Sequence, residues 1–347
     1  MRAVVAHGPR DFRLDDVVEP RRSSGAVLDV EAAGVCAADR MIWRGDGPWA
    51  LSFPFIPGHE ILGRVSWVDD DCAERWGVAV GDRVTAEVMV PCRRCRLCGT
   101  GRTNLCRSGT HLGSGLAGAF AERMALPAGA VVHGVPSELT TEAAVLAEPT
   151  ACAVHAVRRA TIGPDDVVAV AGIGSIGAAA VGVAAGRGRR LLAVATSPAR
   201  AELALALGAD DAVDLSSTPA GRGALEALRE LSGGAGPDVF IDCSGAVEAV
   251  ELGLAAVVAG GRLVLYGVYR RPATVDLNVV AEHKELDVRG AHLAPGAFPE
   301  ALASLSDGAV DASLIVTHRH PLSEFGAALG DAPAGDRLKA ILVPGHA

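Results

Sequence analysis

The stretch Val167-Val-Ala-Val-Ala171-Gly172-Ile-Gly174-Ser175-Ile176-Gly177 decides the fold of the second half of the chain. Its five small apolar residues predict a buried strand, and the three glycines predict a tight turn that leads into a helix. Such a turn lets the backbone approach a bound molecule closely, and the free N–H groups of the helix attract a phosphate. The residues expected to bind a dinucleotide are therefore Gly172, Gly174, Ser175, Ile176 and Gly177. The alternative is a glycine-rich turn that only packs an α/β unit.

Apolar strands alternate with helical stretches rich in alanine and leucine from Val167 onward. This alternation predicts a parallel, doubly wound sheet. The expected strands are 167–171, 191–195, 239–242 and 262–267, and the expected helices are 176–186, 199–207, 223–231 and 246–259. Beyond about Leu286 the pattern becomes irregular, and the remaining residues are expected to rejoin the first part of the chain.

The end of the second expected strand bears on the choice of dinucleotide. An acidic residue usually stands there and binds the ribose diol of NAD. Here Ala195 takes that place, so no carboxylate binds the diol or repels a 2′-phosphate. Thr196, Ser197 and Arg200 follow and are candidates to bind that phosphate, although Arg200 has the alternative role of beginning the next helix. The sequence favours NADP over NAD.

Four cysteines lie within fifteen residues of the first half: Cys92, Cys95, Cys98 and Cys106. The two-residue gaps between the first three allow all four sulfurs to converge on one tetrahedral ion. Four thiolates with no open position are the pattern of a structural Zn²⁺. The alternatives are two disulfides or free thiols.

Length and composition limit the possible class of protein. At 347 residues the chain is expected to form about two domains. A net charge of −9 with no basic run argues against nucleic acid and membrane surfaces as partners. The start of the chain lacks the apolar run of a signal peptide, and the uncharged stretch 167–186 is explained by a strand, turn and helix. We therefore expect a cytoplasmic protein. In that reducing compartment, clustered cysteines bind metal rather than form disulfides. The other cysteines, Cys72, Cys152 and Cys243, are expected to be small buried hydrophobic residues.

The first 150 residues have frequent glycine and proline, and strands are expected at 26–31, 61–68 and 83–88. Three segments in this part offer further metal ligands: Gly34-Val-Cys36-Ala-Ala-Asp39, Pro57-Gly-His59-Glu60 and Leu146-Ala-Glu148-Pro149. One cysteine, one histidine and one carboxylate leave a fourth position open, as in a catalytic zinc site. The alternatives are a core histidine at His59 and a buried thiol at Cys36.

Over essentially its full length the chain resembles the zinc-dependent medium-chain alcohol dehydrogenases. The resemblance is carried by these three segments, the four-cysteine lobe, Gly118-Ala-Phe-Ala-Glu122, the glycine-rich turn and Asp242-Cys-Ser-Gly245. The segment 148–155 resembles the polyol (sorbitol-type) branch, in which a glutamate replaces the third cysteine or histidine ligand.

The resemblance implies an α/β protein with a GroES-like, mostly β catalytic domain and a Rossmann nucleotide-binding domain. The implied bounds are 1–152 for the catalytic domain, with a zinc lobe at 90–108, 153–287 for the Rossmann domain, and 288–347 for the return to the catalytic domain. The resemblance also implies a homodimer or homotetramer, joined through the sheet edge of the nucleotide-binding domain.

The resemblance also implies roles for the site residues. Cys36, His59 and Glu148 would hold a catalytic zinc, Glu148 either directly or through water. Glu60 would be an outer or alternating ligand, and Asp39 would orient the His59 imidazole. Zinc lowers the pKa of a bound alcohol, and hydride passes to C4 of the nicotinamide. Two zinc ions per chain are thus expected, one catalytic and one structural.

The chain departs from the family pattern at two places. Ala38 stands where a serine or threonine normally relays the alcohol proton, so we expect a route through water and a carboxylate. Leu293 and Ala294 replace an Arg-aromatic pair that contacts substrate hydroxyls, with His292 as a possible substitute. The change at Leu293 and Ala294 argues against sorbitol itself. Together with the polyol-type Glu148 and a composition rich in alanine, glycine and arginine, it suggests a cyclitol or aminocyclitol.

Three rival functions remain open. The first is an amino-alcohol dehydrogenase of the threonine type, and the second is a non-catalytic protein that only binds nucleotide. The third is a zinc-free quinone or enone reductase.

Overall fold

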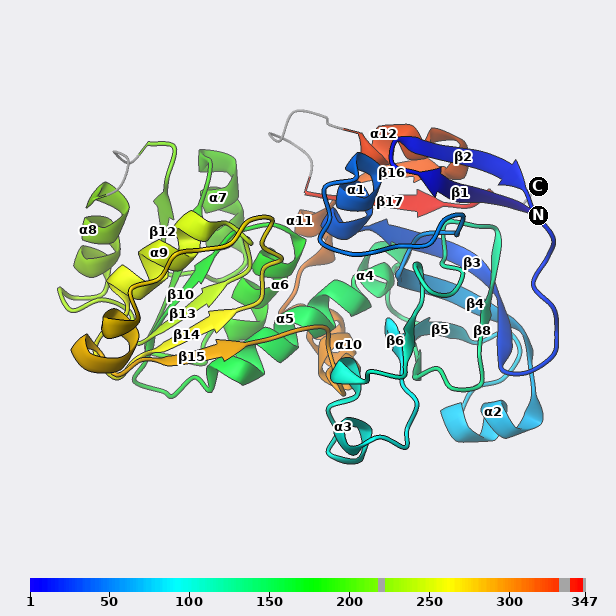
Figure 1. Cartoon of the computed structure of the whole chain (residues 1–347), viewed down its shortest axis with the longest axis horizontal. Helices are drawn as coiled ribbons and strands as arrows, with labels where there is room; N and C mark the ends of the chain where they lie inside the picture. Colours follow the sequence, from blue (N-terminus) through cyan, green and yellow to red (C-terminus); the bar gives the residue numbers. More distant parts are fainter. Residues whose placement is uncertain (218–221, 331–337, 346–347) are drawn as a thin grey trace. The chain divides into compact units, whose positions relative to one another are not determined.

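The computed structural model describes residues 1–217, 222–330 and 338–345. The chain divides into two compact units, drawn in Figure 1. Unit 1 comprises Met1–Ala151, Leu293–Ser306 and Ala312–Ala347, and unit 2 comprises Cys152–His292 and Asp307–Asp311.

Unit 2 contains the parallel, doubly wound sheet that the strand–helix alternation predicts. Its order within the described residues is β12-β11-β10-β13-β14-β15. These strands are β10 (Val167–Ala171), β11 (Arg190–Ala195), β12 (Asp211–Asp214), β13 (Val239–Asp242), β14 (Arg262–Leu265) and β15 (Asp287–Gly290). The helices between them are α6 (Ser175–Ala184), α7 (Pro198–Ala206), α8 (Arg222–Leu231) and α9 (Val247–Ala256), followed by the π-helix η2 (Val279–His283).

Two strands of unit 2 differ from the expectation. The sequence pattern missed β12 and β15, which form the two edges of the sheet. Both contain aspartate and lack the apolar run of the central strands, because one side of an edge strand faces water. β15 also corrects the expectation that regular structure of this sheet ends near Leu286.

Unit 1 is built on a mostly antiparallel sheet with the order β16-β17-β3-β4-β5-β9, and β8 also pairs with β3. Its strands are β3 (Ala26–Val35), β4 (Glu60–Val68), β5 (Arg83–Ala86), β8 (Arg123–Leu126), β9 (Val132–Gly134), β16 (Val316–Pro321) and β17 (Lys339–Val343). Two small sheets pair β1 (Arg2–Gly8) with β2 (Asp11–Asp16) and β6 (Met89–Val90) with β7 (Thr110–His111). β17, from the end of the chain, pairs with β3, so residues far apart in sequence meet in one sheet.

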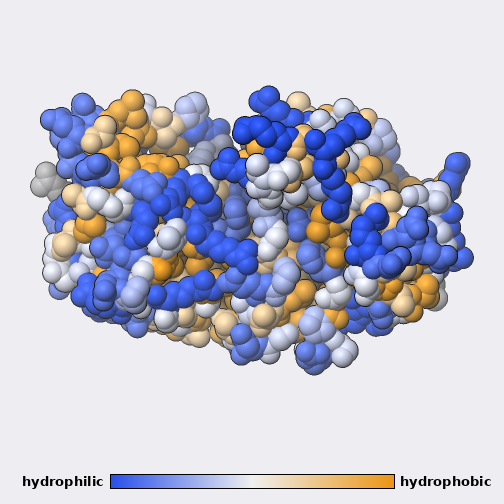
Figure 2. Space-filling model, turned by 90° about the horizontal axis from the view of Figure 1, so that it is seen from below, coloured by the Kyte–Doolittle hydropathy of each residue, from blue (hydrophilic) through white to orange (hydrophobic). Residues whose placement is uncertain are grey.

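Short helices connect these strands. They are α1 (Ala37–Arg44), α2 (Asp70–Trp76), α3 (Arg96–Gly99), η1 (Thr103–Leu105), α4 (Thr141–Val145), α5 (Ala147–Ala160), α10 (Phe298–Ser306), α11 (Ala312–Ile315), η3 (Leu322–Glu324) and α12 (Phe325–Leu329). Among the described residues, no helix has the length and apolar character needed to cross a membrane. The face in Figure 2 intersperses hydrophilic with hydrophobic residues.

The three cysteines outside the predicted metal sites do not all behave as expected. Cys72 and Cys152 are buried, as predicted. The prediction for Cys243 was wrong, because this residue is only partly buried just after β13.

Candidate functional site

The four-cysteine lobe brings its sulfur atoms together. The Cys95 Sγ lies 3.5 Å from the Cys98 Sγ and 3.9 Å from the Cys106 Sγ, and all four sulfurs lie within 4.8 Å of one another. Zn–S bonds of about 2.3 Å in a tetrahedron place sulfurs about 3.8 Å apart, whereas a disulfide needs about 2.05 Å. All eight cysteines are free, so the donor set fits a tetrahedral zinc better than disulfides.

Backbone N–H groups of this lobe favour the thiolate forms of Cys92 and Cys95, whereas burial raises the pKa of the Cys98 thiol to about 12. The N–H of Arg94, more than any other donor, lowers the pKa of the Cys92 thiol to about 6. The N–H of Cys92 itself lies 3.3 Å from the Cys106 Sγ. Donors placed in this way favour the charged sulfur that binds a metal.

A second cluster joins Cys36, His59 and Glu60, whose ligand atoms lie within 4.8 Å of one another. The strand register explains this arrangement. β3 and β4 pair with Gly34 opposite Glu60. Cys36 follows β3 and His59 precedes β4, so the two side chains meet at the same end of the pair.

Asp39 supports both of these ligands from α1. Its Oδ2 accepts a hydrogen bond of 2.9 Å from the N–H of Cys36, and its Oδ1 lies 3.7 Å from the His59 Nδ1. Burial alone would lower the pKa of the His59 imidazole, but Asp39 and Cys36 raise it well above its ordinary value. A carboxylate behind Nδ1 leaves Nε2 to face a metal.

Glu60 is held by a lysine that the sequence reasoning missed. The Lys339 Nζ donates to the Glu60 Oε1 at 2.6 Å and Oε2 at 2.8 Å, and it lies 3.3 Å from the Val35 carbonyl. Glu60 is 1 % exposed and Lys339 2 %. The lack of a side chain at Gly34 makes room for this pair, since a Cβ there would lie 1.8 Å from the Glu60 Oε2.

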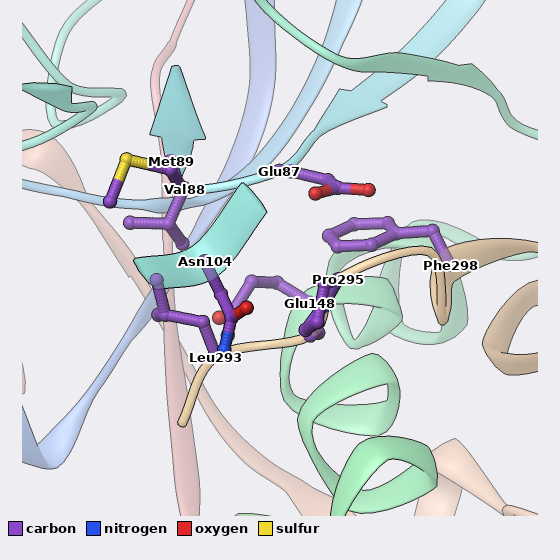
Figure 3. Close-up of a pocket in the computed structure, with 9 residues that line it drawn as sticks. Glu87, Val88, Met89, Asn104, Glu148, Leu293, Pro295 and Phe298 are labelled. Carbon is purple, nitrogen blue, oxygen red and sulfur yellow. The ribbon is translucent and has the colours of Figure 1, made fainter. Parts of the chain in front are cut away.

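Glu148 lies outside the close cluster of Cys36, His59 and Glu60. It extends from α5 into a cavity of about 10 Å³, which is near the lower limit for one water. Figure 3 shows it in this cavity together with Asn104 of η1 and Leu293. Its charge still helps to raise the pKa of His59. The structure therefore places Glu60, rather than Glu148, beside Cys36 and His59.

Three large aromatic residues of unit 1, Trp43, Trp49 and Phe298, differ in their burial. Phe298 is buried, lines the Glu148 cavity and stacks on His133 with ring centroids 4.8 Å apart. Trp43 packs against the core and Trp49 is 40 % exposed. His292, the possible substitute for the lost polar contact, is exposed at the end of unit 2.

The glycine-rich turn of unit 2 has the shape that a pyrophosphate needs. Gly172 has a φ of +86°, and a Cβ on it would lie 2.5 Å from the Ser244 Cβ. A Cβ on Gly177 would meet the Gly172 carbonyl oxygen at 2.0 Å, whereas nothing lies within 4 Å of that position at Gly174. The first and third glycines are therefore required for packing, and the space beside the second is free for a ligand. Ser175 and Ile176 begin α6 immediately after it.

A cavity of about 500 Å³ adjoins this turn. It is lined by Gly172, Thr196 and Ser244, by apolar residues of α8 and α9, and by Glu248 and Glu251 of α9. Ala195 is fully buried at the end of β11, and Ser197 is the N-cap of α7. Arg200, in the first turn of α7, is partly buried, which lowers its pKa. The cavity has the size and polar edge of an adenosine site.

Asp242 fixes the far side of this turn. It is fully buried, and its carboxylate accepts hydrogen bonds from the Ser244 N–H at 2.8 Å and from the Tyr269 hydroxyl at 2.5 Å. These contacts hold Ser244 against Gly172. Asp242-Cys-Ser-Gly245 was identified in the sequence only as a motif that carries the family resemblance, without this role.

The comparisons with known proteins agree with both halves of the chain. Residues 22–137 match the alcohol dehydrogenase GroES-like domain, and residues 175–307 match the zinc-binding dehydrogenase domain. The chain belongs to the zinc-type medium-chain alcohol dehydrogenase family. This dehydrogenase is thus an NAD(P)-dependent oxidoreductase with a GroES-like and a Rossmann domain, as the sequence predicted.

Its curated relatives include polyol and amino-alcohol enzymes. The erythritol/L-threitol dehydrogenase of Mycolicibacterium smegmatis is 40 % identical over 99 % of this chain and 98 % of that protein. The sorbitol dehydrogenase of Halalkalibacterium halodurans is 30 % identical over 99 % of each. The L-threonine 3-dehydrogenase of Streptomyces coelicolor is 35 % identical over 95 % of each.

A solved structure agrees as well. The crystal structure of a zinc-binding dehydrogenase from Sinorhizobium meliloti 1021, bound to NADP, superposes with a TM-score of 0.90. It is 27 % identical, and the match covers 99 % of each chain.

Proposed function

We propose that this dehydrogenase oxidises a secondary hydroxyl group of a polyol, or reduces the matching ketone, with NADP as the preferred cofactor. The observation that carries the proposal is the cluster of Cys36, His59 and Glu60, backed by Asp39, because it combines soft and hard ligands of a catalytic zinc. The relatives named for polyols supply the substrate class.

We propose two Zn²⁺ ions per chain. Cys92, Cys95, Cys98 and Cys106 would hold the structural ion, and Cys36 and His59 with Glu148 or Glu60 the catalytic one. When bound, the catalytic ion supplies a Lewis acid that lowers the pKa of an alcohol. Around it, Asp39 keeps the His59 ring in one orientation and Lys339 balances the charge of Glu60.

The substrate proposed first is a small acyclic polyol. Erythritol and threitol are acyclic, and the relative named for them is 40 % identical. The cyclitol suggested by Leu293 and Ala294 stays a prediction. The amino-alcohol reading has support in the relative named for L-threonine, and it is the second candidate.

A substrate panel tests this function. Zinc-loaded enzyme would be assayed for reduction of NADP⁺ and NAD⁺ with erythritol, threitol, sorbitol, inositols, aminocyclitols and L-threonine. We expect an acyclic polyol to exceed L-threonine in kcat/KM by at least about tenfold, or ~1.4 kcal/mol. A higher kcat/KM for L-threonine than for every polyol would instead establish an amino-alcohol dehydrogenase. Tight cofactor binding without turnover of any compound would support the hypothesis of a non-catalytic protein that only binds nucleotide.

The cofactor preference has its own test at Arg200. The change Arg200→Gln removes a charged donor from the proposed 2′-phosphate site, so the KM for NADP⁺ should rise about 10- to 100-fold. The KM for NAD⁺, which lacks that phosphate, should change by no more than about twofold. Steady-state kinetics with both cofactors would measure the two values. Equal weakening of both cofactors would mean that Arg200 only supports the start of α7.

We also propose that the enzyme is a cytoplasmic homodimer or homotetramer with the order of domains predicted above, and that it binds neither nucleic acid nor membranes. β15 is an edge strand of its sheet, and Val288 on it is 41 % exposed. Such an edge is open to pairing with a second copy. The molar mass in solution would decide the assembly.

A further inference from the structure

The segment that carries His111 is tied to the segment that precedes His59. His111 ends β7, where it lies opposite Met89 of β6. The chain then turns back, and the N–H groups of Gly115 and Leu116 donate to the His111 carbonyl at 3.0 Å and 2.9 Å. Beyond the turn, the N–H of Gly118 donates to the Ile56 carbonyl at 2.8 Å, and that of Ala119 to the Gly58 carbonyl at 2.9 Å.

Close packing fixes the turn at the same place. A Cβ on Gly113 would lie 3.0 Å from the carbonyl carbon of Gly58, the residue before His59. Two residues after His111, the backbone thus touches the metal-site segment. His111 is therefore held beside the Cys36–His59–Glu60 cluster by backbone contacts rather than by its own side chain.

The His111 ring has hydrogen-bonding capacity to spare. It is partly buried, and over the part of the chain that the structure describes no hydrogen bond or ion pair engages it. Burial, and then the charge of His59, lower the pKa of His111. The lowered pKa favours the neutral form of the ring, and the backbone contacts above hold it on the segment next to His59. A neutral imidazole offers one donor and one acceptor, which matches a hydroxyl group.

The substrate needs such a group. A polyol presents further hydroxyls beside the one that reacts, and burying them without partners would be costly. Ala38 and Leu293 supply only apolar side chains where the family resemblance leads us to expect a hydroxyl group and an arginine. We propose that His111 binds a hydroxyl group of the substrate adjacent to the reacting one and thereby selects polyols over simple secondary alcohols. This inference rests on the proposed polyol function and deepens it.

The kinetic test compares His111→Phe with His111→Gln and with His7→Phe. His7 is a partly exposed histidine of β1 paired with Asp15, and it serves as the matched control. For the polyol that the wild type oxidises best, His111→Phe should raise KM about 10- to 100-fold, and His111→Gln should restore part of the loss. His7→Phe should leave KM within about twofold of the wild-type value.

A chemical test detects the proposed contact between His111 and the substrate without requiring turnover. Diethyl pyrocarbonate modifies free neutral imidazoles, and mass spectrometry follows the modification of His111 in the zinc-loaded enzyme with NADP⁺. A polyol at ten times its Kd should slow that modification about tenfold, while His7 should react at an unchanged rate.

The outcomes separate this inference from the function on which it rests. Turnover of a polyol by the wild type, together with unchanged KM in His111→Phe or unprotected His111, would overturn the inference alone. Turnover of no polyol would overturn both.

Discussion

The variant Cys36→Ser should lose at least about 10³-fold in alcohol oxidation, or about 4 kcal/mol of transition-state stabilisation, while its fold stays intact. Cys36 supplies the sulfur of the cluster with His59 and Glu60, and it is only partly buried, between the end of β3 and the start of α1. A serine oxygen is a much weaker zinc ligand than a thiolate. Steady-state rates and the thermal unfolding midpoint of the same preparation would check both parts.

The matched control is Cys95→Ser in the four-cysteine lobe. Its sulfur is central to that lobe, 3.5 Å from one neighbour and 3.9 Å from another. A structural metal site contributes folding free energy, so its loss should cost at least about 3 kcal/mol and lower the midpoint by roughly 6–12 °C. Metal analysis should find one zinc fewer in each variant. Equal unfolding of both variants would show that the roles assigned to the two clusters are wrong.

The buried strands of unit 2 could be predicted because each one is an apolar run. β10 and β13 begin and end where the sequence pattern placed them, at 167–171 and 239–242. Both lie inside the sheet, where neighbouring strands and helices cover them, so burial dictates their composition. β12 and β15 could not be predicted in this way, because each pairs along one edge only.

The candidate site was predictable in its residue types but not in its arrangement. Cys36 and His59 stand in short segments with few other candidates, and the structure brings them together. Which carboxylate lies beside Cys36 and His59 was harder to predict, since Glu60 and Glu148 both stand in segments that resemble the family's metal-binding segments. Their positions depend on the register of β3 with β4 and on a partner 279 residues away, neither of which is visible in a local pattern.

His111 illustrates the same limit. A single histidine between Cys106 and Gly118 gives no periodic signal, and its proximity to His59 arises from backbone contacts with Ile56 and Gly58. The one signal in the sequence was that His111 follows closely after the four-cysteine lobe, which is part of the family resemblance. Contacts between loops are set by tertiary packing, which sequence periodicity does not encode.

The variant Lys339→Met should both destabilise the enzyme and slow it. Removing Lys339 leaves the Glu60 carboxylate buried without its ion pair, which should cost about 3–5 kcal/mol of unfolding free energy. Burial would by itself lower the pKa of the Lys339 ammonium, but Glu60 raises it above its ordinary value, so Lys339 is charged at pH 7. Without Lys339, the Glu60 carboxylate would be free to bind the zinc ion proposed at Cys36 and His59. It would then compete with the substrate for the open position on that ion. We therefore expect kcat/KM for the alcohol to fall at least about tenfold, or ~1.4 kcal/mol.

Two further variants separate the kinetic effect from simple loss of stability. Adding Glu60→Gln to Lys339→Met removes the unpaired charge, so denaturant unfolding should recover most of the lost free energy. Lys284→Met is the matched control, since Lys284 is the other lysine of the chain and donates to the carbonyls of Leu254, Ala255 and Val257 at the end of α9. Losing those hydrogen bonds should lower stability without changing the KM for the alcohol. If Lys284→Met and Lys339→Met slow turnover equally, Lys339 acts only through stability and does not position Glu60.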